Sequence, residues 1–137
     1  MDYSFFKKNC PYWREIMTLF LKQGSQFEIR CWKEERTSIL KACKSGCISE
    51  KDSTDYEVSI KGTLEKSIIN EILNPDMDDI NEKMTEFFTI NINGQIDIEH
   101  YGKEIYIFNP EENIKDRLYE IIEPVQEYFS IEEYEQL

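Results

Sequence analysis

The sequence predicts one α+β domain over residues 1–137: an antiparallel sheet that includes a C-terminal three-stranded meander, packed with an N-terminal helix and a C-terminal helix. Three observations favour this class. Apolar and polar residues alternate in several short runs, Asn93-Gly94 joins two of these runs, and apolar residues recur at helical spacing near both ends. A chain of 137 residues fits one domain, and 40% hydrophobic residues suffice for a packed core.

The first helix is expected over residues 11–22. Pro11 suits a first helical turn, and Gly24 suits the position just past a helix end. The apolar face of this helix comprises Trp13, Ile16, Met17 and Phe20. An alternating run at 27–31 then predicts a half-buried strand.

The middle of the chain is less clear. Residues 34–53 fit either a short helix or a strand, and both alternatives stay open. A second alternating strand is expected over 56–61. Thr63 is expected to cap a helix whose apolar face lies within 68–73 and which ends at Asn74-Pro75.

The meander is the clearest signal in the chain. Residues 88–92 and 96–99 alternate on either side of Asn93-Gly94, a dipeptide that favours a tight hairpin because both turn residues adopt positive φ. A turn near Tyr101-Gly102 leads into a third alternating run at 105–108. These residues predict three antiparallel strands with one apolar face.

The last helix is expected to begin at Asn109, with Asn109 as its N-cap and Pro110 in its first turn. Its apolar stripe would cover the sheet, and Pro124 would kink or divide it. A ladder of carboxylates falls opposite the stripe at 100° per residue. The ladder comprises Glu112, Asp116, Glu120, Glu123 and Glu127.

The negative charge lies almost wholly in the second half. The net charge is −12; residues 1–66 hold 12 Lys/Arg and 10 Asp/Glu, and residues 67–137 hold 4 and 18. This asymmetry favours a basic protein partner and argues against direct binding of a nucleic acid. A second acidic group, at Asp76, Asp78 and Asp79, would extend the ladder's surface. The alternative interpretation is that these carboxylates only form a solvent-exposed helix face and bind no partner.

No cofactor or metal is expected. The spacing of Cys43 and Cys47 occurs in some zinc sites, but no second ligand pair accompanies it. A calcium loop starting at Asp76 fails because Ile80 and Phe87 occupy ligand positions. Without an export signal or an apolar run of about 18 residues, the chain is expected to be cytoplasmic, with free thiols and no membrane span.

Enzyme function is not expected, because the chain lacks the phosphate-binding, nucleophile-elbow and zinc-protease motifs. The alternative is a small enzyme centred on His100, the single histidine, acting as a general base with Cys31 or Cys43 as nucleophile. Asp97 and Glu99 would lie on one strand face, which is the expected polar face of a half-solvated sheet.

In size, charge and element order, with its Asn93-Gly94 meander and acidic helix at 111–129, the chain resembles bacterial immunity proteins of polymorphic-toxin and contact-dependent growth inhibition systems. The resemblance implies a small cytosolic binding protein that neutralises a cognate toxin, often a basic nuclease. A DNA mimic that inhibits DNA-binding proteins is the other binding hypothesis. The two differ in selectivity, because an immunity protein blocks one partner and a DNA mimic several.

Overall fold

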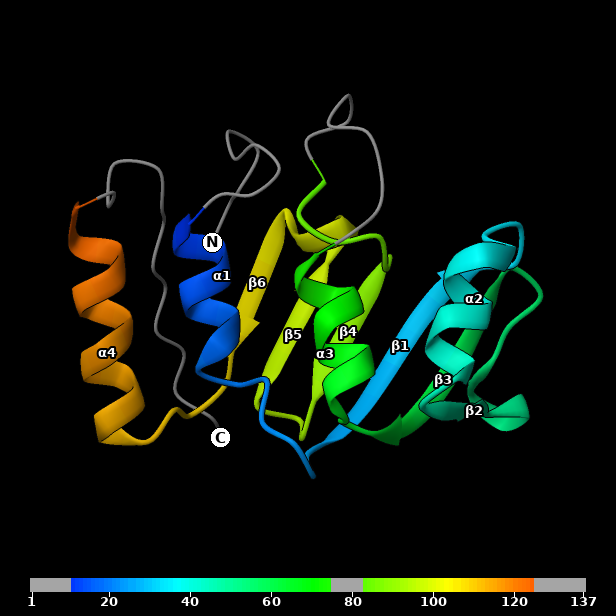
Figure 1. The fold of residues 1–137 in the computed structure, drawn as a ribbon, viewed down its shortest axis with the longest axis horizontal. Helices are drawn as coiled ribbons and strands as arrows, with labels where there is room; N and C mark the ends of the chain where they lie inside the picture. The colour runs from blue at the N-terminus through cyan, green and yellow to red at the C-terminus, as the bar shows by residue number, and fades with distance from the viewer. Residues whose placement is uncertain (1–10, 75–82, 125–137) are drawn as a thin grey trace.

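The computed structural model describes residues 11–74 and 83–124, and these form a six-stranded antiparallel sheet with helices (Figure 1). The predicted α+β class is therefore confirmed. The strand order across the sheet is β2-β3-β1-β4-β5-β6. The strands are β1 (Gln26–Trp32), β2 (Gly46–Ile48), β3 (Glu57–Thr63), β4 (Thr89–Ile92), β5 (Ile96–Glu99) and β6 (Glu104–Ile107).

The described helices gather on one side of the sheet. They are α1 (Pro11–Thr18), α2 (Arg36–Cys43), α3 (Lys66–Leu73) and α4 (Glu112–Ile122), with short 3-10 turns η1 (Glu50–Asp52) and η3 (His100–Gly102). In Figure 1, α2 and α3 lie in front of the strands, α1 stands beside β6, and α4 stands on the outer side of α1. The last helix thus reaches the core by packing against α1 rather than by lying across the strands. No helix in the described ranges is long and apolar enough to cross a membrane.

The core lies between the sheet and these helices. Ile29 in β1 is opposite Ile60 in β3 and Ile90 in β4, and all three are fully buried. The expected apolar face of α1 is also buried, which confirms Trp13, Ile16, Met17 and Phe20 as core residues. Alternate residues of β1, such as Glu28 and Arg30, point to the opposite face and are only half-buried.

The meander is confirmed. Asn93 and Gly94 connect β4 to β5 with φ values of 52° and 68°, as the hairpin signal requires. The next turn, η3, leads from β5 into β6. It also contains residues with positive φ, Tyr101 at 60° and Gly102 at 90°. Three antiparallel strands therefore follow one another directly along the chain.

Both predicted caps are wrong. Thr63 is the last residue of β3, where its hydroxyl accepts a hydrogen bond from Gln26 Nε2 at 3.1 Å, and Glu65 is the N-cap of α3. The N-cap of α4 is Glu111, because Asn109 takes up a left-handed conformation at φ 43° before the helix begins. At Thr63 the cause is that β3 extends two residues beyond its expected end at residue 61.

Two further boundaries differ from expectation. The regular part of α1 ends at Thr18, earlier than residue 22. Residues 34–53, whose sequence fits either a helix or a strand, contain both. α2 is followed by the short edge strand β2 and by η1. The helix packs against β1, β2 and β3, so tertiary contacts decide the local structure of this ambiguous segment.

Candidate partner-binding surfaces

The acidic ladder lies on the outer face of α4. Its described members, Glu112, Asp116, Glu120 and Glu123, are all exposed. The opposite side of the helix is buried in the core through Leu118, Ile121 and Ile122. The predicted separation of an apolar stripe from a carboxylate face is therefore confirmed for this part of the helix. Glu127 and the second acidic group, Asp76, Asp78 and Asp79, lie outside the described residues.

Glu120, in the ladder, forms an ion pair with Arg117. Arg117 Nη1 is 2.7 Å from Glu120 Oε2, three residues along the helix. Both side chains are well exposed, so this ion pair contributes little to stability and is easily exchanged for another partner. Between residues 111 and 124 the sequence holds five carboxylates and two basic side chains, which leaves the surface of α4 negative.

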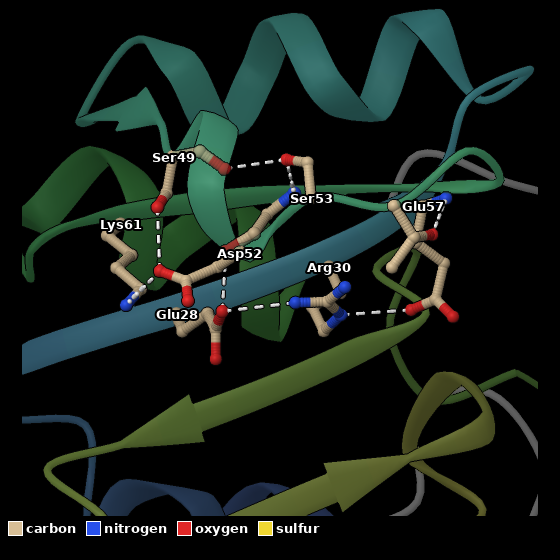
Figure 2. A network of polar contacts seen from close by, with 9 residues as sticks. Glu28, Arg30, Ser49, Asp52, Ser53, Glu57 and Lys61 are labelled. Atoms are coloured by element: carbon tan, nitrogen blue, oxygen red, sulfur yellow. Dashed lines mark hydrogen bonds and ion pairs between the residues drawn. The ribbon is translucent and has the colours of Figure 1, made fainter.

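A second polar surface lies on the face of the sheet opposite the helices (Figure 2). Arg30 in β1 is at its centre: Nε is 3.0 Å from Glu57 Oε1 in β3, and Nη1 is 3.3 Å from Glu28 Oε2. Ser59 Oγ donates a further hydrogen bond to the same oxygen of Glu28. One guanidinium thus links two carboxylates across adjacent strands.

The outer part of this network ties η1 to β3. Asp52 Oδ2 is 2.7 Å from Lys61 Nζ and accepts a hydrogen bond of the same length from Ser49 Oγ. The hydrogen bond from Lys61, helped by that from Ser49, lowers the pKa of Asp52 below its usual value. Ser53 Oγ donates to the Ser49 carbonyl and accepts from the Ser59 amide, so this corner is fixed by several short contacts (Figure 2).

Replacement of Arg30 by methionine is expected to destabilise the fold by about 1–2 kcal/mol, because two half-buried carboxylates lose their shared donor. Urea unfolding at neutral pH measures the loss. Lys61→Met is the matched control, since its ammonium and its partner Asp52 are more exposed, and it should cost less. An equal loss in both variants would show that Arg30 has no special role.

A groove opens at the end of the molecule formed by β2 and η1. Its volume is ≈450 Å³, and its walls come from β2, the residues around η1, and β3. The lining residues are Lys33, Ile48, Glu50, Ser53, Thr54, Asp55 and Val58. None of the predicted site residues lies in this groove.

The alternative enzyme site is centred on His100, in η3. His100 is 59% exposed, and its Nδ1 is 3.0 Å from Glu104 Oε2. A carboxylate is therefore within hydrogen-bond reach, as that hypothesis requires. The thiol of Cys31 is fully buried, and burial raises its pKa to about 12, so it stays protonated and is a poor nucleophile at neutral pH.

The other described cysteines are free thiols: Cys43 is half-buried at the end of α2 and Cys47 is exposed in β2. Within residues 11–74 and 83–124, no group of three or more histidine, cysteine or acidic side chains could hold a metal ion. The described part of the chain therefore offers no partner set for a zinc site at these two cysteines.

Asp97 and Glu99 point to one face of β5, as expected from their spacing. Asp97 is opposite Tyr106 in β6, and Glu99 is opposite Glu104. Burial raises the pKa of Glu99 to about 7, and a hydrogen bond shared with Asp97 adds to the increase. This half of the sheet face therefore holds three carboxylates close together.

An aromatic cluster lies where β1 and the meander meet. The Phe88 ring is 4.7 Å from that of Trp32 and 5.3 Å from that of Tyr101. Lys83 Nζ lies 3.8 Å above the Tyr101 ring, and the Tyr101 hydroxyl donates to Glu35 at 2.8 Å. Burial, followed by this hydrogen bond, raises the pKa of Tyr101. Nothing in the local pattern predicts the cluster, because its members come from distant segments.

No protein-family model, curated protein or solved structure matches the chain significantly. Function is therefore inferred from the charge, exposure and contacts of its own side chains.

Proposed function

We propose that this chain is a binding protein that neutralises a basic protein toxin through an acidic surface that includes the outer face of α4. The observation that carries the proposal is the arrangement of Glu112, Asp116, Glu120 and Glu123. All four are exposed on one helix whose apolar side is held in the core. A charged face on a fixed support needs little reorganisation when a partner of opposite charge approaches.

The charge distribution supports a basic partner. Residues 67–137 carry a net charge of −14, against +2 for residues 1–66. A field of this kind accelerates association with a positively charged protein and makes it sensitive to salt. The resemblance to immunity proteins points to a toxin, frequently a nuclease, as that partner.

The first test is capture followed by neutralisation. The tagged chain is incubated with lysate of its source cells at about 0.05 M and about 0.3 M salt, which changes the screening length about 2.5-fold. The captured protein is then expressed alone and together with the chain. The proposal expects one dominant basic partner whose expression arrests growth, and relief of the arrest by the chain. Capture of several unrelated DNA-binding proteins, all displaced by DNA, would indicate a DNA mimic instead.

The second test is charge reversal on α4. The triple variant Glu112→Lys, Asp116→Lys, Glu120→Lys is expected to weaken the complex on the order of 10- to 100-fold, mainly through slower association at low salt. The matched control reverses three exposed carboxylates at other places, Glu34, Glu50 and Asp55, with the same change in net charge. Biosensor kinetics with the captured toxin measure both. Equal weakening would mean that net charge alone matters, and an unchanged α4 variant would overturn the proposed surface.

A further inference from the structure

The polar face of the sheet divides into two parts with different charge balance. Over β1 and β3 the carboxylates have a cationic partner, since Arg30 pairs with both Glu28 and Glu57. Over β5 and β6, Asp97, Glu99 and Glu104 have no lysine or arginine ion pair within the described ranges. One edge of the sheet thus concentrates negative charge without a permanent counter-charge.

The strand register brings these carboxylates together. Asp97 and Glu99 are two residues apart on one face of β5, and Glu99 is directly opposite Glu104 in β6. Like charges directly opposite each other destabilise an antiparallel pair. Glu99 is only half-exposed, so water screens the repulsion incompletely. A proton on Glu99, shared with Asp97 through a hydrogen bond, removes one of the three charges and most of the repulsion.

The other described groups around Glu99 do not remove the repulsion among the carboxylates as the proton does. From β4, the neutral Asn91 is opposite Asp97. From β6, the Tyr106 hydroxyl is 3.3 Å from Glu104 and Tyr106 is opposite Asp97. From η3, His100 contacts Glu104 and, when charged, favours the ionised form of Glu99.

We propose that Asp97, Glu99 and Glu104 form a proton-sensitive switch at the β5–β6 edge, in which one shared proton holds the two strands together and its loss loosens them. The pKa of Glu99, raised to about 7 from an ordinary 4.5, supports this role. Because the folded chain holds this proton over a range where the unfolded chain has lost it, stability falls as pH rises from about 4.5 to about 7 and levels off above. The switch therefore acts close to physiological pH.

Carboxyl-carbon NMR of the free chain tests the switch directly and requires no partner. One glutamate is expected to titrate near pH 7, and its signal should be absent in Glu99→Gln. In Asp97→Asn the midpoint should move down by about 1 pH unit or more, because the shared hydrogen bond and the neighbouring charge are lost. Asp116→Asn on the exposed face of α4 is the control and should leave the midpoint unchanged. If every glutamate titrates near its ordinary value, the switch is overturned.

Urea unfolding between about pH 5 and about pH 7.5 tests the consequence for the fold. The wild type should show an increase on the order of 10- to 100-fold in its unfolding constant over this range, and Glu99→Gln should lack most of that increase. Following Glu99 itself by NMR ties the change in stability to this carboxyl group. Amide exchange, corrected for intrinsic rates, should rise with pH in β5 and β6 but not in β3. A Glu99→Gln variant with the wild-type pH dependence, or equal changes in β3 and β6, would overturn the proposal.

Discussion

Replacement of Gly102 by alanine is expected to destabilise the protein by about 2–5 kcal/mol. Gly102 ends η3 at φ +90°, a conformation that side chains rarely adopt. A Cβ atom there would lie 2.6 Å from Met84 Cβ and 3.0 Å from Trp13 Nε1, and both neighbours are buried. The added methyl group therefore meets a packed core as well as a strained backbone.

Gly94→Ala separates these two causes. Gly94 also has positive φ, at +68°, but no heavy atom lies within 4 Å of an added Cβ. Its replacement should cost about 1 kcal/mol, from backbone strain alone. Urea unfolding at constant pH measures both variants. Similar losses would show that crowding by Met84 and Trp13 is not the main effect.

Ile29→Ala is expected to cost about 2–5 kcal/mol. Ile29 is fully buried at the middle of the sheet, opposite Ile60 on one side and Ile90 on the other. Truncation leaves a cavity that the neighbouring strands can fill only partly, because their backbones are held by the ladder. Leu40→Ala in α2 is the control: the leucine is 68% exposed, and its loss should stay within about 0.5 kcal/mol. A small loss for Ile29→Ala would contradict its place at the centre of the core.

The elements that local pattern predicted well are those whose partners are close in sequence. The hairpin at Asn93-Gly94 is one, because its turn chemistry and both of its strands lie within 11 residues, 89–99. The caps at Thr63 and Asn109 were predicted wrongly. For Thr63 the competing interaction is a long-range one, a hydrogen bond from Gln26 in another strand. A single sequence contains no record of such a pairing.

In the candidate site, too, the features set by local spacing could be predicted and those set by long-range contacts could not. The exposure of the α4 carboxylates follows from helical geometry, so it could be predicted from spacing alone. The alternation of β1 and β3 places Glu28, Arg30 and Glu57 on polar strand faces. Their actual partners depend on register between strands about 30 residues apart in the chain, which spacing does not determine. Of the carboxylates in β5 and β6, the sequence predicts only Asp97 and Glu99 as a polar face, because Glu104 joins them through the register between the two strands.

The central position of β1 has a consequence for synthesis. β1 leaves the ribosome before both of its neighbours, β3, which ends at Thr63, and β4, which ends at Ile92. The chain must therefore emerge as far as Ile92 before both sides of β1 are paired. Until then its unpaired backbone groups and its apolar side chains are open to other chains and to chaperones. The local meander can form as soon as it emerges, so the attachment of β1 to β4 is the step that joins the two halves of the sheet.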